Sequence, residues 1–259
     1  MLSSATLREA LAGSAGFWHD VRVVAETGST NADLLAAAKT GAGEGVVLAA
    51  DTQSAGRGRL GRRWASPPGT SLSFSVLLRP VAVPAARRAW VPLLAGVAVA
   101  AAVRGEAAVD AGLKWPNDVL ARGGKLAGIL AEQAGDAIVV GIGVNVTVGR
   151  DDLPAAGATS LLLEGAASTD RERLLAAVLG QLGRWYLGWK DEAGDADRSG
   201  LRQEYLRWCA TVGQRVRVSL PGGTTVTGEA ADVDRAGRLV VRSAVGLIPV
   251  SAGDVVHVR

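Results

Sequence analysis

The chain has 259 residues with 48% hydrophobic content, a formal net charge of +3 and a single cysteine. This length predicts one large domain, or one domain with a small one attached, and the apolar content is ample for a core. One cysteine excludes an internal disulfide, and a basic excess this small permits nucleic-acid binding without requiring it.

Helices and strands alternate in the first part of the chain. The expected elements are a helix over 6–12, a strand over 21–26, a helix over 31–39, strands over 46–50 and 71–78, and a long Ala-rich helix from Pro84 through Val103. The apolar stretch 89–103 contains Pro92 and is shorter than the roughly 18 residues of a membrane span, so we expect a buried helix and no membrane association. Arg8 and Glu9 stand where a signal peptide needs apolar residues, which favours a cytoplasmic protein.

The rest of the chain adds hairpins and then changes in texture. Arg122-Gly123-Gly124 predicts a turn between strands, and the further expected elements are strands at 119–120, 125–132 and 137–146 and helices over 170–189 and 199–210. From residue 212, short β-rich runs between turns predict a small barrel with strands over 215–219, 224–230, 238–242 and 246–250. The sequence thus predicts an α+β protein: a mixed sheet flanked by helices in residues 1–210, and a small β domain in 211–259.

Residues 53–64, here termed the Arg/Gly loop, read Gln-Ser-Ala-Gly-Arg-Gly-Arg-Leu-Gly-Arg-Arg-Trp. Glycines let the backbone turn and expose its N–H groups, and arginine forks match carboxylate and phosphate oxygens, so the loop is interpreted as an anion receptor. The alternative is an ordinary solvated surface loop. Trp64 either covers a nucleotide base or anchors the loop to the core. Four like charges predict that the empty loop is mobile and becomes ordered when a ligand neutralises them.

Three further segments carry polar residues at strand ends. Thr-Gly-Ser-Thr-Asn at 27–31 either caps the following helix or contacts a small polar ligand. Lys-Trp-Pro-Asn-Asp at 114–118 is typical of a turn closed by Asx hydrogen bonds, whereas Lys125 begins an apolar strand and either reaches solvent or faces an anion. Gly-Ile-Gly-Val-Asn at 141–145 places an amide at the end of a buried strand, where glycines admit a ligand close to the backbone.

His19, His257 and Cys209 lie outside these segments, and we expect packing or surface roles for them. The segments themselves hold anion receptors, an aromatic ring and one carboxylate suited to Mg²⁺, that of Asp118, but no evident nucleophile or histidine base. Chemistry that needs only positioning and charge neutralisation is phosphoryl or nucleotidyl transfer.

In this order, with Ser29-Thr30-Asn31 upstream, the segments resemble the signature segments of biotin protein ligases over about residues 20–150. The β-rich tail resembles the SH3-like C-terminal domain of that family in its pattern of short β-rich runs separated by turns. The resemblance implies a biotin/lipoate ligase-like catalytic domain that uses ATP and Mg²⁺ to convert biotin into biotinyl-5′-adenylate and pyrophosphate. It also implies transfer of biotin to one lysine of the biotin carboxyl carrier domain of an acyl-CoA carboxylase.

The same resemblance implies roles for individual residues. Lys125 and Arg59 are the implied catalytic residues, with Lys125 on the biotin carboxylate and the α-phosphate. Trp64 is implied to stack on adenine, and Asp118 to serve Mg²⁺. The implied biotin-binding residues are Ser29, Thr30, Asn31, Gln53, Arg57, Gly58, Arg59, Lys125 and Gly128. The implied ATP- and adenylate-binding residues are Arg57, Arg59, Trp64, Lys114, Asn117 and Asn145.

Some members of that family carry an N-terminal helix-turn-helix domain that represses transcription. Here about 28 residues precede the Ser-Thr-Asn motif, and part of them belongs to the first helix and strand. A three-helix DNA-reading module needs a longer segment. We therefore expect a short form of the ligase without specific DNA binding, as a monomer or a weak homodimer.

Two other functions compete with this interpretation. A lipoate-protein ligase shares the architecture and the adenylation chemistry, but the continuous Gly-Arg-Gly-Arg run and the 114–118 segment favour biotin. A basic nucleic-acid-binding protein could use the Arg/Gly loop and the C-terminal barrel. The barrel has no Phe, Tyr or Trp for stacking on bases, and Trp64 is the one such ring near the loop.

Overall fold

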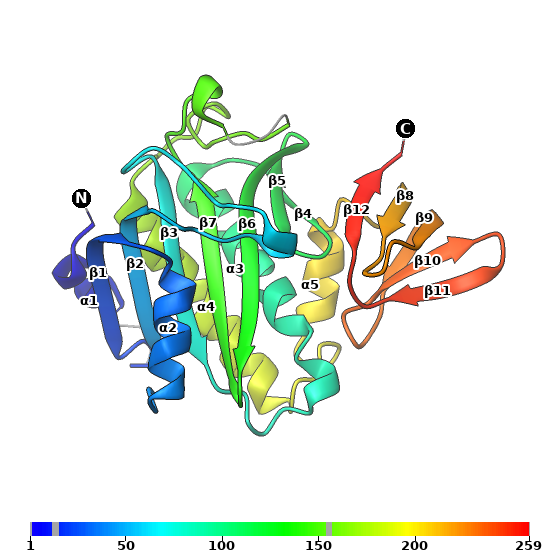
Figure 1. The fold of residues 1–259 in the computed structure, drawn as a ribbon, viewed down its shortest axis with the longest axis horizontal. Helices are drawn as coiled ribbons and strands as arrows, with labels where there is room; N and C mark the ends of the chain where they lie inside the picture. The colour runs from blue at the N-terminus through cyan, green and yellow to red at the C-terminus, as the bar shows by residue number, and fades with distance from the viewer. Residues whose placement is uncertain (1, 12–15, 154–156, 259) are drawn as a thin grey trace.

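Seven strands form one mixed sheet in the order β1-β2-β3-β7-β6-β5-β4 (Figure 1). This computed structural model describes residues 2–11, 16–153 and 157–258. β1 and β2 run parallel and the other neighbouring strands run antiparallel, so the predicted mixed sheet is confirmed. The strands are β1 (Asp20–Thr27), β2 (Val46–Gln53), β3 (Ser71–Leu78), β4 (Ala111–Lys114), β5 (Asp118–Ala121), β6 (Gly124–Ala134) and β7 (Ala137–Asn145).

Helices cover both faces of this sheet, with α3 and α4 on one face and α2 on the other (Figure 1). The helices are α1 (Ser4–Leu11), α2 (Thr30–Lys39), α3 (Trp90–Ala107), α4 (Arg171–Asp191) and α5 (Leu201–Trp208), with single 3-10 turns η1 (Arg59–Gly61), η2 (Ala85–Arg87) and η3 (Arg150–Asp152). Side chains of β2 alternate between the two faces. Val47 and Ala49 join the main core with α3, whereas Val46 and Leu48 pack with Leu34 of α2.

The core helix α3 begins later than predicted. Pro84 precedes the short turn η2, and α3 starts at Trp90 with Pro92 in its first turn, where a missing backbone N–H breaks no helical hydrogen bond. Within the described residues, 85–107 is the one helical segment long and apolar enough to cross a membrane. Most of α3 is buried against the sheet and α4, as the sequence predicted for a core helix.

Two short strands, β4 and β12, were not predicted from the sequence. Each has four residues, too few to show the alternation that marks a strand. The predicted first helix is present from Ser4, and its expected end at Ala12 lies outside the described residues.

The C-terminal strands form a separate five-stranded antiparallel sheet in the order β11-β10-β9-β8-β12, which is consistent with the expected SH3-like fold. They are β8 (Arg215–Ser219), β9 (Thr225–Val233), β10 (Leu239–Ser243), β11 (Gly246–Val250) and β12 (Asp254–His257). Two buried indoles hold the β9–β10 turn. Trp90 donates to the carbonyl of Arg235 at 2.8 Å and Trp115 to that of Gly237 at 3.0 Å. This docking leaves β12 beside the β4–β5 end of the large sheet (Figure 1).

Candidate active site

The middle of the large sheet is built from small residues that lie in register. Gly143 of β7 is paired with Gly128 of β6. A Cβ atom on Gly143 would come 2.3 Å from the Trp64 ring, and one on Gly141 would come 2.2 Å from Oδ1 of Asn31. These glycines therefore let the indole and the amide rest directly on the sheet. The sequence predicted that a ligand approaches the backbone at these glycines. The side chains of Trp64 and Asn31, two predicted ligand-binding residues, lie there instead.

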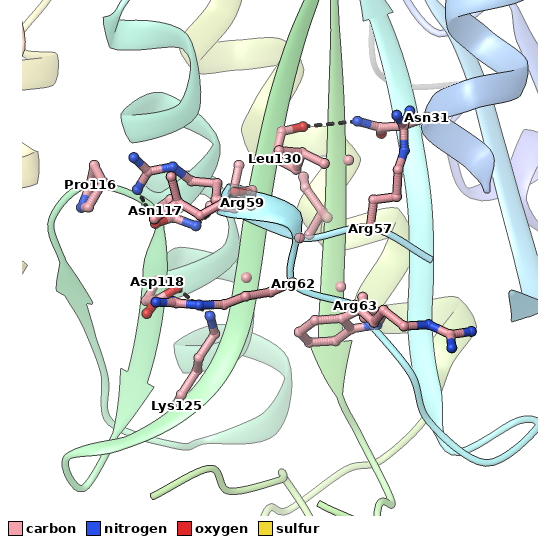
Figure 2. Close-up of a pocket in the computed structure, with 18 of the residues that line it drawn as sticks. Asn31, Arg57, Arg59, Arg62, Arg63, Pro116, Asn117, Asp118, Lys125 and Leu130 are labelled. Atoms are coloured by element: carbon pink, nitrogen blue, oxygen red, sulfur yellow. Dashed lines mark hydrogen bonds and ion pairs between the residues drawn. The ribbon is translucent and has the colours of Figure 1, made fainter. Parts of the chain in front are cut away.

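A cavity of about 590 Å³ is lined by residues of this floor, of the Arg/Gly loop and of β12. Figure 2 shows the arginines of the loop at this cavity. Every site residue predicted from the sequence lines it: Ser29, Thr30, Asn31, Gln53, Arg57, Gly58, Arg59, Trp64, Lys114, Asn117, Asp118, Lys125, Gly128 and Asn145. The fold thus brings together segments as far apart in the chain as Ser29 and Asn145. The ligand that each residue contacts stays a prediction.

The start of α2 supplies an uncharged, polar side of the cavity. Ser29 accepts a hydrogen bond from the backbone N–H of Ala32 at 3.5 Å, so the helix-capping interpretation is confirmed. Thr30 donates its backbone N–H to Oε1 of Gln53 at 2.9 Å, which orients that amide at the end of β2. The Thr30 hydroxyl lies 2.7 Å from the hydroxyl of Ser75, a fully buried residue of β3 that no local pattern marks as part of a site.

Asn31 is hydrogen-bonded through every polar atom of its side chain. Its Oδ1 accepts from the Ser75 hydroxyl at 2.6 Å. Its Nδ2 donates to the carbonyl of Leu130 at 3.2 Å (Figure 2). The same Nδ2 donates to Oε2 of Glu132 at 2.8 Å. Glu132, on β6, is a second residue that the sequence did not single out. These contacts fix which way the buried amide faces.

The other side of the cavity is charged (Figure 2). Nζ of Lys125 lies 2.6 Å from Oδ1 of Asp118 across the β5–β6 hairpin. Nη1 of Arg59 donates to Oδ1 of Asn117 at 2.9 Å. Burial lowers the pKa of Arg59, and the neighbouring carboxylates of Asp118 and Asp254 oppose that shift. Cations are thus gathered where an anionic substrate could replace their present partners.

Each arginine of the Arg/Gly loop already has an oxygen partner. The partners are Glu132 for Arg57 (3.1 Å), Asn117 for Arg59 (2.9 Å), Asp254 for Arg62 and the carbonyl of Ser54 for Arg63 (3.0 Å). The four like charges from which mobility was predicted are thus each opposed by an oxygen in the absence of ligand, and the mobility of the empty loop stays a prediction. Two of the partners, Glu132 and Asp254, are carboxylates from distant parts of the chain. Local sequence patterns could not predict these contacts.

Residues of β12 form the part of the cavity wall that belongs to the C-terminal sheet. The hydrogen bond from Arg62 lowers the pKa of the Asp254 carboxyl, and burial opposes the shift. Nη2 of Arg59 also reaches the carbonyl of Gly253 at 3.4 Å. The loop therefore bridges the two sheets. Sequence reasoning missed Asp254 because it lies in an unpredicted strand and in no motif.

Among the described residues, and apart from Oδ1 of Asp118, which is ion-paired with Lys125, two buried polar atoms of the cavity lining have no hydrogen-bond partner. They are Nε1 of Trp64, a donor, and Oδ1 of Asn145, an acceptor. Nδ2 of Asn145, a residue of the cavity lining, donates to the carbonyl of Thr159 at 2.9 Å, so only Oδ1 of this amide is left without a partner. An unmade buried hydrogen bond costs about 1–3 kcal/mol, and a ligand that satisfies both atoms would recover it.

The residues expected to have ordinary roles lie elsewhere. Nε2 of His19 is 2.8 Å from the carbonyl of Glu44. Burial lowers the pKa of His257 and raises that of the Cys209 thiol. None of the three lines the cavity in the part of the chain that the structure describes.

Asp118 is the one predicted metal-binding residue. Within residues 2–11, 16–153 and 157–258, no group of three His, Cys, Asp or Glu side chains gathers to hold a metal ion. Mg²⁺ in nucleotide sites is usually held by one or two carboxylates together with substrate phosphates. A single carboxylate beside a cationic cavity fits that kind of donor set.

The chain resembles known proteins along its whole length. The Biotin/lipoate A/B protein ligase family matches residues 25–148, and the Biotin protein ligase C terminal domain matches residues 211–258. A biotin–[acetyl-CoA-carboxylase] ligase of Mycobacterium tuberculosis is 47% identical over 262 residues, which cover 100% of this chain and 96% of that protein.

Two solved structures share the fold. The biotin protein ligase from Aquifex aeolicus in complex with biotin and ATP is 28% identical, with a TM-score of 0.76, and the match covers 93% of this chain and 99% of that one. The biotin protein ligase from Leishmania major in complex with biotinyl-5-AMP is 25% identical, with a TM-score of 0.62 and coverage of 90% and 99%.

Proposed function

This chain belongs to the biotin protein ligases of the Biotin/lipoate A/B protein ligase family, and we propose on that premise that it joins biotin to the adenylyl group of ATP, with release of pyrophosphate, and then to a carrier lysine within one cavity. The observation that carries the proposal is the cavity itself. It places an uncharged polar side, a cationic side and the Arg/Gly loop over one glycine floor. Biotin needs this combination, because it has a neutral cyclic urea at one end and a carboxylate at the other.

In the proposed binding mode, biotin lies beside Asn31 and Trp64, the side chains that cover the glycine floor. Thr30, Asn31 and Gln53 face its urea, and Ser29, Arg57, Gly58 and Gly128 complete its surroundings. Its carboxylate reaches Lys125. Trp64 stacks on adenine, and the nucleotide is further contacted by Lys114, Asn117, Arg59 and Asn145.

The first step needs charge neutralisation and no proton transfer. A carboxylate oxygen of biotin attacks the α-phosphorus of ATP, a new oxygen–phosphorus bond forms, and the bond to the pyrophosphate oxygen breaks. The Lys125 ammonium exchanges Asp118 for the reacting carboxylate and α-phosphate, whose charge it stabilises. No histidine lines the cavity in the described residues, which suits a step without a general base.

Mg²⁺ would be held by the triphosphate with Asp118 as its protein ligand, and when bound it supplies further neutralisation of phosphate charge. Asp118 becomes available for it once Lys125 turns toward substrate. Arg57 and Arg59 lie over the reacting groups and exclude water from the mixed anhydride.

The second step transfers biotin to protein. The neutral amine of the acceptor lysine attacks the acyl carbon of the adenylate, the bond to the phosphate oxygen breaks, and an amide, AMP and one proton are formed. We propose the biotin carboxyl carrier domain of an acyl-CoA carboxylase as the partner. We further propose a cytoplasmic enzyme divided into domains 1–210 and 211–259, monomeric or weakly dimeric, without membrane or specific DNA binding.

Mass spectrometry of a purified carrier domain tests the transfer. Incubation with the enzyme, biotin and ATP is expected to add one biotin to the acceptor lysine. A carrier with that lysine replaced by arginine should stay unmodified. An unmodified wild-type carrier, in the presence of an enzyme that forms adenylate, would contradict the proposed partner.

Gly143→Ala is expected to lower the rate of adenylate formation about 100-fold. The added methyl group would lie 2.3 Å from the Trp64 ring and push the indole off the floor. The rate is measured by biotin-dependent ATP–pyrophosphate exchange. Gly180→Ala is the matched control, because a Cβ there meets nothing within 4 Å on α4 and alanine favours a helix. An unchanged rate in Gly143→Ala would show that the position of Trp64 does not matter for the reaction.

A further inference from the structure

We propose that Glu132 is a positioning residue of this ligase: its carboxylate holds the Arg/Gly loop over the cavity and at the same time sets the Asn31 amide that faces biotin. A single oxygen, Oε2, accepts from Nδ2 of Asn31 at 2.8 Å and from Nη2 of Arg57 at 3.1 Å. The two donors come from α2 and from the loop, so one carboxylate on β6 joins the cavity wall to its cover. The proposal rests on the proposed function in taking biotin as the ligand.

The contact with Asn31 decides what this side chain offers to a ligand. Both hydrogens of Nδ2 are used, one by Glu132 and one by the carbonyl of Leu130, while Oδ1 accepts from Ser75 at 2.6 Å. A flipped amide would place its oxygen against two acceptors. Asn31 is therefore held with an acceptor lone pair available, which suits an N–H of the cyclic urea. Without Glu132 one of the two groups that prevent the flip is lost.

The same contact chain continues to the other residues of the uncharged side. The Ser75 hydroxyl donates to Asn31, so at 2.7 Å it accepts from the Thr30 hydroxyl. Thr30 in turn binds Gln53 through its backbone N–H. Glu132 thus stands at the junction between this hydrogen-bonded chain and the loop. Such chains make the positions of their members interdependent.

The contact with Arg57 is one of two charged attachments of the loop. Arg57 is attached to the large sheet through Glu132, and Arg62 to the C-terminal sheet through Asp254. The backbone N–H of Gly58 donates to the carbonyl of Arg62 at 2.7 Å and Arg57 pairs with Arg63, so the two attachment points lie close together at the base of a turn. Leu60 lies in that turn with its side chain 66% exposed. Opening of the loop therefore requires that the Glu132 contact breaks.

Glu132→Gln tests both parts of the proposal, the contact of Glu132 with Arg57 of the loop and its contact with Asn31. Loss of the negative charge is expected to raise the rate of thermolysin cleavage before Leu60 several-fold without ligand. It is also expected to weaken biotin binding about ten-fold, measured calorimetrically without ATP, since charge-assisted hydrogen bonds are about twice as strong as neutral ones. Glu106→Gln is the matched control, because Glu106 pairs with Arg173 at 3.3 Å and is 33% exposed, against 26% for Glu132, but its ion-pair partner Arg173 does not line the cavity, whereas Asn31 and Arg57 do.

Arg57→Ala separates the two contacts, because it removes the contact of Glu132 with the loop and keeps its contact with Asn31. Cleavage of Arg57→Ala should equal that of Glu132→Gln, and the double variant should be cleaved no faster, because both changes break the same contact. Biotin affinity should still fall when Glu132→Gln is added to Arg57→Ala, because the charge-assisted hydrogen bond between Asn31 and Glu132 is lost only then. A merely structural role would instead lower the urea midpoint of unfolding and leave cleavage before Leu60 unchanged.

Two results would overturn the proposal. One is wild-type cleavage and wild-type biotin affinity in Glu132→Gln. The other is additive cleavage in the double variant, which would show that Glu132 does not act through Arg57. Failure of the wild-type enzyme to bind biotin would contradict the proposed function instead, while the cleavage comparison would still decide whether Glu132 holds the loop.

Discussion

Lys125→Ala is expected to reduce biotin-dependent ATP–pyrophosphate exchange about 10²- to 10³-fold, the range seen when a preorganised charge-stabilising group is removed. Nζ of Lys125 is placed by β6 at 2.6 Å from Asp118, where it can turn to the carboxylate and α-phosphate of the reactants. Without it, two anions must meet in a partly buried site with less compensation. Exchange is measured with labelled pyrophosphate at saturating biotin and ATP.

Lys39→Ala is the control for Lys125→Ala, because Lys39 is exposed at the end of α2 and does not line the cavity. Its exchange rate should match the wild type. Circular dichroism and thermal unfolding should show that both variants are folded. Near-normal pyrophosphate exchange in folded Lys125→Ala would remove this lysine from the mechanism.

Arg59→Gly is expected to let the adenylate escape before transfer. The Arg59 side chain binds Asn117 of the large sheet at 2.9 Å and the carbonyl of Gly253 beside β12 at 3.4 Å, so it closes the cavity toward both sheets. Its removal opens that side and adds a flexible residue to the loop. Released biotinyl-adenylate is expected to rise about 100-fold, which corresponds to two lost charge-assisted contacts of about 1.4 kcal/mol each.

Promiscuous biotinylation of bystander proteins measures this escape. Arg63→Gly is the matched control, because it adds the same glycine to the loop but removes only a contact with the Ser54 carbonyl. Labelling of bystanders should be much weaker in Arg63→Gly than in Arg59→Gly. Strict carrier specificity in Arg59→Gly would show that Arg59 does not retain the adenylate.

The predicted site residues could be found from the sequence because each belongs to a short segment with unusual chemistry. Arginine alternating with glycine, and a lysine that opens an apolar strand, stand out without knowledge of the fold. The strand order could not be found in that way. β7 lies between β3 and β6, which is why Gly143 meets Gly128 in the middle of the sheet and forms a floor.

The carboxylate partners of the loop arginines could not be predicted from the sequence for a different reason. Glu132 is 75 residues from Arg57, and Asp254 is 192 residues from Arg62. Neither carboxylate lies in a motif, so local sequence patterns did not reveal that two of the loop arginines are paired with carboxylates in the absence of ligand. Ser75 was hidden likewise, because a serine in an alternating strand has no local mark of a buried hydrogen-bonded role.

Biotin-dependent ATP–pyrophosphate exchange tests the central claim most directly, because it reports adenylate formation in the cavity without the carrier. Biotin is expected to support exchange by the wild-type enzyme, while lipoate and octanoate at equal concentration support little and compete poorly. Exchange that requires lipoate or octanoate and ignores biotin would contradict the account.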